Sequence, residues 1–245
     1  MAIFLKANWE NIIMVNYEID QEILTPFLPK GVDLDLYNGK AYVSLVGFMF
    51  KKTKLFNVPI PKLGTFEEIN LRFYVTRTDE NNKIKRGVVF INETIPYKIV
   101  AWMANKLYKE HYTVVPTKHN IIKDDEYQKI KFEWLLDNKW NSIYVENGLS
   151  SQKMKQDSFE KFIYEHYYGF TKTGDHKTEE YSLHHPSWKI HQVINYQIDC
   201  NFKAMYGNSF SVLNDTKPTS VFIAEGSSVA IEWKRTKIKF ANAER

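Results

Sequence analysis

The chain of 245 residues is 44% hydrophobic and 15% aromatic, which excludes disorder over most of its length and favours β-strands. Its single cysteine, Cys200, excludes both an intramolecular disulfide framework and a cysteine-based zinc cluster. The net charge of +4 lies largely in two lysine-rich segments without interleaved aromatics and glycines, so we expect no nucleic acid partner.

The first predicted elements are a short helix and a β-hairpin. A helix is expected at 20–27, where Asp20 can cap the first turn. Polar and apolar residues then alternate over 32–37, and Asn38-Gly39 supplies the positive φ angles of a type I′ turn. The chain is expected to return as a strand over 41–50 that pairs with 32–37.

The segment 66–75 is predicted to be a strand, after an irregular proline-containing loop at 51–65. One of its faces is apolar enough for a core and consists of Glu67, Ile69, Leu71, Phe73 and Val75. The other face sets an acid, an amide and a base between two aromatics: Phe66, Glu68, Asn70, Arg72 and Tyr74. On a half-buried strand this face would be solvated, whereas inside a barrel it would form a polar site in a closed cavity.

The rest of the chain is predicted to combine strands with two helices. A turn at 79–82 is expected to join two strands, and Pro96 begins a helix that ends near Tyr108. A second helix is expected from Asp157, with Glu160 completing a capping box. Further strands are expected at 111–116, 128–136, 142–146, 179–184, 188–202, 209–213, 219–225 and 228–235, the last two paired around Gly226-Ser227.

These elements predict one mainly β (α+β) domain over residues 1–245, with about ten strands and two or three short helices. A closed or nearly closed sheet is favoured, because closure removes exposed strand edges. No apolar run reaches the ~18 residues of a membrane span, and the N-terminus lacks the features of a signal peptide. We therefore expect a cytoplasmic protein without membrane contact.

The polar face of the strand at 66–75 offers the clearest chemistry. Glu68 and Arg72 are four residues apart, roughly 13 Å along a strand, and Asn70 lies between them. We interpret this face as an anion-binding arginine and an acid in a cavity. The alternative is a solvated face, or one paired with a neighbouring strand.

The sequence contains no motif for metal binding, nucleophilic catalysis or nucleotide binding. His184 and His185 point to opposite faces of a strand, and no HExxH sequence occurs, so we expect no metal and no cofactor. Neither a GxSxG motif nor a glycine-rich nucleotide loop is present. Lys51 and Lys52 are adjacent, but they leave a strand into a proline-rich loop and are expected to be solvated.

Several segments spread along the chain match the motifs of one family. They are Trp9, Tyr17–Asp20, Leu24–Pro29, Gly39–Val46, Phe48, Phe66–Val75, Glu165–Tyr167 and His185–Trp188. In this order they resemble the YqjF-like family of uncharacterised bacterial proteins. The last two segments correspond to a family Glu-Arg-Tyr and a family His-Pro-Pro-Trp, and the resemblance covers about residues 9–235.

The resemblance implies a fold like that of acetoacetate decarboxylase, in which a β-barrel-like sheet with a few helices encloses a cavity. In that enzyme the cavity holds a lysine pair beside a glycine- and proline-bearing turn, together with buried acids and an arginine. The corresponding segment here, 107–112, lacks the Pro-Lys-Lys sequence and has Lys109 as its one lysine. The resemblance therefore implies a cavity with an acid and an arginine, without decarboxylase activity.

We predict that this cavity binds a small anionic or carbonyl-bearing metabolite. The candidate ligand-binding residues are Glu68, Asn70, Arg72, Tyr74, His111 and Tyr112. One alternative is a lyase or hydrolase of a small keto acid without a Schiff-base lysine pair, with Glu68 and His111 as candidate catalytic residues. Another is a non-catalytic scaffold whose core is filled by its own side chains. The oligomeric state stays open, a homodimer being one possibility.

Overall fold

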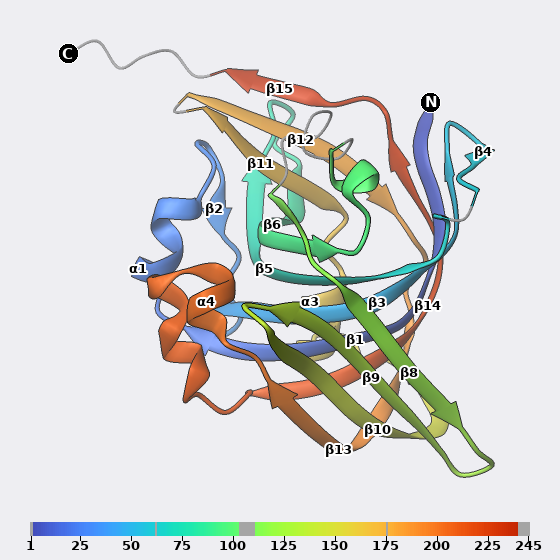
Figure 1. Ribbon diagram of the computed structural model, residues 1–245. Coiled ribbons are helices and arrows are strands. Elements are labelled where there is room, and N and C mark those ends of the chain that lie inside the picture. The colour runs from blue at the N-terminus through green and yellow to red at the C-terminus, as the bar shows by residue number, and fades with distance from the viewer. Residues whose placement is uncertain (1, 62, 103–110, 175, 240–245) are drawn as a thin grey trace.

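The computed structural model describes residues 2–61, 63–102, 111–174 and 176–239 (Figure 1). The strands are β1 Ile3–Ile19, β2 Asp33–Leu34, β3 Ala41–Leu55, β4 Val58–Pro59, β5 Phe66–Thr78, β6 Ile84–Ile95, β7 Tyr112–Val114, β8 Thr117–Lys123, β9 Tyr127–Leu136, β10 Lys139–Lys153, β11 Tyr168–Gly174, β12 Lys177–His184, β13 Lys189–Asp199, β14 Ser220–Glu232 and β15 Thr236–Lys239. The helices are α1 Gln21–Leu24, α3 Phe159–Tyr164 and α4 Phe202–Tyr206, with 3₁₀ turns η1 Thr25–Phe27 and η2 Asn208–Asn214.

Seven of these strands close into a ring. Their order is β12, β11, β6, β5, β3, β1 and β14, and the ring closes because β14 also pairs with β12. The closing contact joins Leu183 to Ile231 and His184 to Ala230. Neighbours in the ring are antiparallel, except for the parallel pair of β11 and β6. This closure gives the barrel-like, mainly β fold that was predicted (Figure 1).

A second layer of four strands packs against part of the outer face of the ring. Strands β13, β10, β9 and β8 follow in that order from β14, and they occupy the lower part of Figure 1. Phe132 of β9 and Ile143 of β10 reach β3 at Gly47, where an added Cβ would lie 2.9 Å and 3.5 Å from their side chains. The glycine therefore allows the two layers to approach closely.

Strand β5 lies between two packed regions, so both of its faces are buried. Ile69, Leu71 and Phe73 are fully buried between the two layers, in what we call the layer core. Phe66 and Tyr74 pack on the other side, in the interior of the ring. The alternation predicted for this strand is therefore confirmed, and its polar face turns into the ring rather than to solvent.

The predicted helix at 20–27 is confirmed as α1 followed by η1, and Asp20 Oδ1 accepts a 2.9 Å hydrogen bond from the Glu22 amide. Its apolar side chains pack against the layer core and include Leu24. The Asn38-Gly39 turn is present as well, with φ values of 51° and 78°.

The hairpin expected around that turn is wrong in its pairing. A single bridge joins Tyr37 to Lys40, and β2 pairs with β5 instead of with β3. The Asp35 amide donates a 3.0 Å hydrogen bond to the Tyr74 carbonyl, and the Asp35 carboxylate is held by Arg86 at 2.6 Å. These partners hold the segment against β5, so tertiary contacts decide the pairing where the turn alone predicted a local one.

Three predictions for segments that are helical in the structure need correction. The first turn of α3 is capped by Ser158, whose Oγ accepts a 3.2 Å hydrogen bond from the Lys161 amide, rather than by Asp157. The segment 209–213, predicted as a strand, is the 3₁₀ turn η2. The helix expected from Pro96 begins at Lys98, and its predicted end lies outside the described residues.

Within the described ranges, no helix has the length and apolar character needed to cross a membrane.

The closing pair predicted around Gly226-Ser227 is instead one continuous strand, β14. Strand β1 runs beside it from Ile3 to Asn16, so the glycine does not turn the chain. Gly226 has φ of +80°, and an added Cβ would lie 2.0 Å from the Trp9 carbonyl oxygen. The glycine signal therefore marks a close approach between two strands rather than a hairpin.

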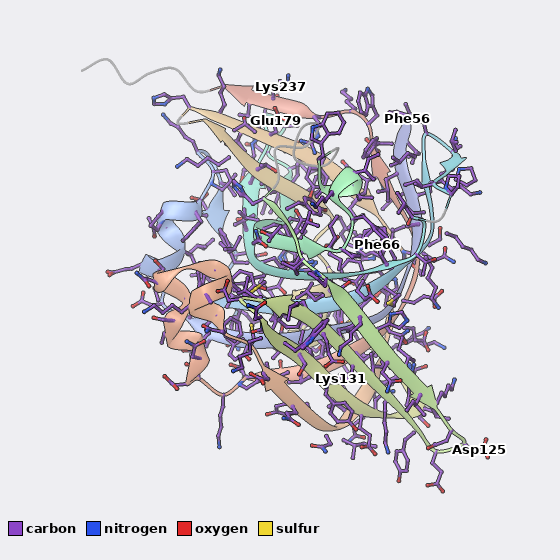
Figure 2. The ribbon with its side chains drawn as sticks, viewed as in Figure 1. Phe56, Phe66, Asp125, Lys131, Glu179 and Lys237 are labelled. Carbon is purple, nitrogen blue, oxygen red and sulfur yellow. The ribbon has the colours of Figure 1, made fainter. Side chains whose placement is uncertain are left out.

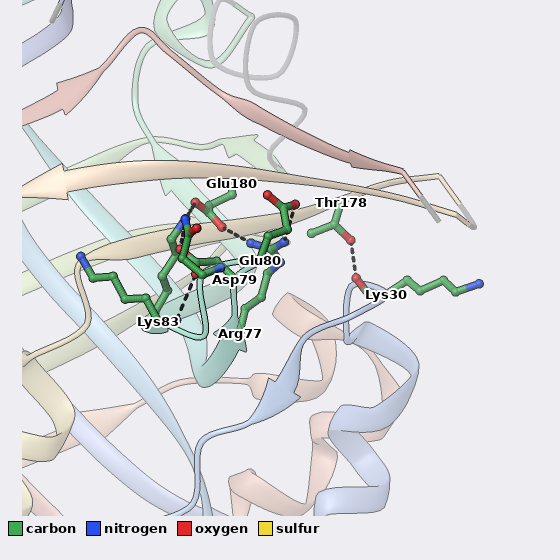
Figure 3. A network of polar contacts seen from close by, with 9 residues as sticks. Lys30, Arg77, Asp79, Glu80, Lys83, Thr178 and Glu180 are labelled. Carbon is green, nitrogen blue, oxygen red and sulfur yellow. Dashed lines mark hydrogen bonds and ion pairs between the residues drawn. The ribbon is translucent and has the colours of Figure 1, made fainter. Parts of the chain in front are cut away.

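A buried network of charges joins the β5–β6 hairpin to β12 at one end of the ring (Figure 3). Arg77 lies 3.1 Å and Lys85 2.5 Å from the two carboxylate oxygens of Glu180. The side chains of Arg77 and Glu180 are 8% and 5% exposed. Nearby, Thr178 Oγ1 donates a 2.8 Å hydrogen bond to the Lys30 carbonyl. The network therefore links segments that are distant in the sequence.

Candidate functional site

A cavity of about 170 Å³ lies inside the ring. Each of the seven ring strands contributes to its wall, as does the segment after β4 and the helical turn near Ile99. Phe66, labelled in Figure 2, lies at the start of β5 and forms part of this wall. The scaffold alternative would require side chains to fill the interior of the ring completely. The cavity shows that they do not.

Strand β5 presents a polar row to this cavity. Glu68, Asn70 and Arg72 all lie on the cavity wall, because alternate residues of the strand face the same side. Glu68 is 3% exposed and Asn70 is 1% exposed. Asn70 Nδ2 donates a 3.0 Å hydrogen bond to Glu68 Oε1, and Asn70 Oδ1 has no hydrogen-bond partner in the described part of the chain. That buried acceptor is available to a ligand.

Arg72 places a partly buried guanidinium on the same wall. Its Nη2 lies 3.8 Å from Met14 Sδ and its Cζ lies 6.0 Å from the centroid of the Tyr74 ring. Among the described residues no carboxylate oxygen lies within 4.0 Å of it, and its Nε has no hydrogen-bond partner. A partly buried cation without a counter-ion is unfavourable, so the cavity favours an anion beside it.

Tyr74 supports Arg72 from the same face of β5. Its hydroxyl is 2.5 Å from Ser44 Oγ, which donates a 2.5 Å hydrogen bond to Asn16 Oδ1. Burial raises the pKa of Tyr74, and Arg72 opposes that shift. The hydroxyl therefore stays protonated at neutral pH. Tyr74 is 1% exposed, packs in the interior of the ring and is not one of the residues that line the cavity.

Glu93 and Tyr112 complete the polar end of the cavity. Glu93 lies directly opposite Asn70 in the pairing of β5 with β6, and it accepts a 2.7 Å hydrogen bond from the Tyr112 hydroxyl. Burial raises the pKa of Tyr112 well above its ordinary value, and the nearby charges of Glu68 and Glu93 raise it further. Tyr112 is thus a hydrogen-bond donor at any physiological pH.

His166, which follows α3, also lies on the wall and is bonded to Asp35. Its Nε2 is 3.0 Å from Asp35 Oδ2, which also accepts a 2.6 Å hydrogen bond from Arg86 Nε. Burial lowers the pKa of His166 to about 4, although the hydrogen bond to Asp35 opposes the shift. The ring is therefore neutral near pH 7. With Nε2–H donated to Asp35, Nδ1 is an acceptor, and no described residue pairs with it.

Of the candidate ligand-binding residues, the structure places Glu68, Asn70, Arg72 and Tyr112 on the cavity wall. It places the His111 side chain on the exposed surface, away from the cavity wall. The reason is the short parallel pairing of β7 with β6: adjacent residues point to opposite sides, so Tyr112 inside leaves His111 outside. The His111 carbonyl accepts a 3.0 Å hydrogen bond from the Glu93 amide.

Sequence reasoning missed two residues of the site. Glu93 could have been found only through the pairing register that sets it opposite Asn70. His166 stands where the family motif has arginine, but it was not assigned to the site. Lys109 lies outside the described residues, and none of the described lysines lies on the cavity wall.

Neither metal ligation nor thiol chemistry is evident in the part of the chain that the structure describes. No three histidine, cysteine, aspartate or glutamate side chains there are arranged to hold a metal ion. Cys200 is partly buried, and burial raises the pKa of its thiol, which disfavours the reactive thiolate.

The closed ring with an internal cavity defines an acetoacetate decarboxylase-like fold. The structure is similar to acetoacetate decarboxylase from Legionella pneumophila, with a TM-score of 0.65 and 11% identity over 99% of this chain and 89% of that one. It is also similar to an acetoacetate decarboxylase-like enzyme from Sphingomonas wittichii RW1, with a TM-score of 0.64 and 9% identity over 98% and 95% of the chains. The enzyme MppR of enduracididine biosynthesis, complexed with pyruvate, gives a TM-score of 0.62 at 8% identity over 97% and 91%. Identities this low show the fold alone.

Within that fold, the chain belongs to the family DUF2071, described as "Uncharacterized conserved protein (COG2071)", whose model matches residues 6–228. A curated relative, "Uncharacterized protein YqjF" of Bacillus subtilis (strain 168), is 28% identical over 109 residues. That match spans 44% of this chain and 43% of the relative, less than half of either. The family resemblance inferred from the sequence motifs is therefore confirmed.

Proposed function

We propose that the protein binds a small anionic or carbonyl-bearing metabolite in the ring cavity. The observation that carries the proposal is Arg72, a partly buried cation on the cavity wall with no carboxylate within 4.0 Å among the described residues. Glu68 stands four residues away along β5, about 13 Å at the Cα atoms. The cation and the acid are therefore separate enough for an anion to approach Arg72.

Other polar atoms on the wall suit the rest of such a ligand. Trp9 Nε1 is buried and has no hydrogen-bond partner in the described part of the chain, so it can donate to an oxygen atom of a ligand. Asn70 Oδ1 can accept from a hydroxyl or an amine. In this proposal Arg72 pairs with the anion, while Asn70 and Glu68 orient the ligand.

The compounds to test first are 2-oxo acids, which carry both a carboxylate and a carbonyl group. Support for this choice comes from the structurally similar enzyme MppR, which was seen in complex with pyruvate. A thermal-shift screen of 2-oxo acids, simple carboxylates and neutral carbonyl compounds would test the proposal. At about 100 times its Kd a ligand stabilises a protein by about 2.7 kcal/mol, which corresponds to a rise in Tm of roughly 5–10 °C at this chain length.

The decisive variant is Arg72→Gln, which removes the charge and keeps a polar side chain of similar length. A hydrogen bond to a charged group contributes about 1.5–3 kcal/mol, so affinity should fall roughly 10- to 100-fold. Lys123→Gln is the matched control, because Lys123 is an exposed cation on β8 outside the cavity. Ligand binding that survives unchanged in both Arg72→Gln and Glu68→Ala would rule out this site.

A second candidate is an enzyme, a lyase or hydrolase of a small keto acid. The observation that favours it is the buried carboxyl of Glu68, held on the cavity wall by a 3.0 Å hydrogen bond from Asn70. A positioned carboxyl of this kind can transfer a proton to or from a bound substrate. Consumption of 2-oxo acids can be followed by NMR. Glu68→Gln should abolish turnover while ligand binding persists, and a wild-type protein that binds without turnover would exclude the enzyme.

Trapping with borohydride separates a Schiff-base mechanism from the one proposed here. We expect no stable gain in mass when the protein is reduced in the presence of a 2-oxo acid, because the Pro-Lys-Lys sequence is absent. A trapped adduct on a lysine would show that a Schiff base forms, and peptide mapping would identify that lysine.

A further inference from the structure

We propose that the ligand of the ring cavity is amphipathic: a small acid that carries an apolar tail. This inference rests on the proposed function, since it places the acid group at Arg72. It adds the chemical class of the rest of the molecule. The argument comes from how polar and apolar side chains are distributed along the cavity wall.

The wall changes from polar to aromatic along β3 and β5. In their antiparallel pairing Ser44 lies opposite Arg72, Phe48 opposite Glu68 and Phe50 opposite Phe66. The Phe50 and Phe66 rings are stacked, with centroids 4.7 Å apart and an angle of 11° between their planes. Arg72 and Phe66 are six residues apart on one face, about 20 Å along the strand. The cation is thus at one end and the aromatic rings at the other.

Trp9 of β1 extends the aromatic end. Its ring centroid lies 4.8 Å from that of Phe48 and 5.7 Å from that of Phe50, and all three side chains lie on the cavity wall. Trp9 also offers its indole N–H, which no described residue accepts. The aromatic end of the cavity therefore also contains a buried hydrogen-bond donor.

Beyond these rings the wall continues as a strip of aliphatic side chains across four strands. Leu55 of β3 pairs with Leu5 of β1, Leu5 pairs with Ile231 of β14, and Ile231 pairs with Leu183 of β12. All four side chains lie on the cavity wall. We call the aromatic rings and this strip together the apolar arm.

The size of the cavity limits the ligand. One water needs at least roughly 10–15 Å³ of cavity, so 170 Å³ holds at most about 11 to 17 waters, which leaves room for a molecule of about ten to twelve non-hydrogen atoms. Pyruvate has about half that number and would leave the apolar arm filled with water. A 2-oxo acid of about eight carbons, or one with a phenyl ring, matches both the volume and the polarity of the wall.

The test is a series of straight-chain 2-oxo acids from three to ten carbons, together with phenylpyruvate, measured by calorimetry on the full chain. Each methylene removed from water should tighten binding about threefold to fourfold, until the arm is full. We expect the gain to level off near eight carbons. Alcohols of equal length lack the carboxylate, and the Arg72→Gln variant lacks its partner. Both therefore measure how much the carboxylate contributes to affinity.

A variant that fills part of the apolar arm provides a second test of the amphipathic ligand. Leu183→Trp adds bulk on the cavity wall, so binding of the longest acids should weaken at least tenfold while acids of three or four carbons bind as before. Ile194→Trp is the matched control, because Ile194 on β13 is 55% exposed and lies outside the cavity. Circular dichroism on both variants establishes that the fold is intact.

Each outcome bears on one of the two proposals. Affinity that does not change with chain length, but still depends on Arg72, would overturn the amphipathic ligand and leave the proposed function standing. Long alcohols that bind as tightly as long acids, with no effect of Arg72→Gln, would overturn the acid group and with it both proposals. Failure of every acid to bind would also overturn both. Tightening with length that Leu183→Trp cuts short would support the inference.

Discussion

The layer core and the interior of the ring share β5, and the polar groups on the two faces of this strand differ in their hydrogen-bond partners. On the layer-core face the buried acid Glu67 has its partners, since Thr117 Oγ1 donates a 2.6 Å hydrogen bond to it and His119 Nδ1 contacts it. On the ring face Asn70 Oδ1 and Arg72 Nε have none among the described residues. A strand face whose buried acid is hydrogen-bonded contributes to a stable core, whereas a face that lines a cavity and carries unpaired groups is suited to a ligand.

The largest effect should come from removing a large side chain from the layer core. Phe132→Ala should cost about 3–5 kcal/mol of unfolding free energy, because Phe132 is fully buried against Gly47. Urea unfolding followed by fluorescence measures this loss. The control is Phe56→Ala. Because Phe56 is 50% exposed, this substitution should lower the unfolding free energy by well under half as much as Phe132→Ala. Equal losses at the two positions would contradict the view that the layer core carries the stability.

The next effect concerns the buried charges that fasten β12 to the β5–β6 hairpin. Arg77→Met should destabilise the protein by about 3 kcal/mol, because the buried Glu180 loses its 3.1 Å partner and, among the described residues, keeps only Lys85. Lys131→Met is the control: Lys131 pairs with Glu133 at 2.9 Å but is 40% exposed, so its loss should cost less than about 1 kcal/mol. A loss of the same size in both variants would show that burial of the network is unimportant.

A pH effect should arise from His166 in the ring interior. Its pKa in the folded protein is about 4, below the ordinary 6.5, so the unfolded chain binds its proton first as the pH falls. The stabilising contribution is complete above about pH 6.5 and is lost as the pH falls toward 4, by at most about 1.4 kcal/mol per pH unit. His166→Gln should flatten the stability profile in this window, whereas His176→Gln, at an exposed histidine, should not. An unchanged slope in His166→Gln would contradict the assignment.

The smallest change in stability is expected at Arg72, in contrast to its large effect on binding. Arg72→Gln should leave the unfolding free energy unchanged or raise it by about 1 kcal/mol, because it removes a partly buried charge that has no counter-ion among the described residues. Urea unfolding without ligand measures this. A loss above about 2 kcal/mol would show that Arg72 holds the fold together and would weaken its role as a binding residue.

Some signals that depend on neighbours in sequence were read correctly, although the cap of α3 and the turn at Gly226 were not. The alternation at 66–75 assigned both faces of β5, and Asp20 capped the helix that it was expected to cap. The period of two in a strand and the hydrogen bond of an N-cap are local properties, so one sequence suffices to predict them. The polar row of Glu68, Asn70 and Arg72 followed from the same alternation.

Features that depend on distant pairing could not be read in this way. The sequence does not reveal that β12 meets β14 through two residue pairs, although that contact closes the ring and creates the cavity. Glu93 joins the site through its register with Asn70, and His166 through the position of α3 against the ring. To place these residues in the site, one must know which strands are neighbours. A one-residue change of register would turn their side chains to the opposite face.

Strand β14 belongs to both regions, and Gly226 stands where its neighbours change. Before the glycine β14 pairs with β13 of the second layer at Ile223 and Ala224, and after it with β12 of the ring at Ala230 and Ile231. Insertion of one residue at this point would turn the side chains of the following half to the opposite face. The side-chain alternation of β14 therefore fixes the register of both the ring and the second layer. Insertions and deletions during evolution are expected in the loops and not in β14.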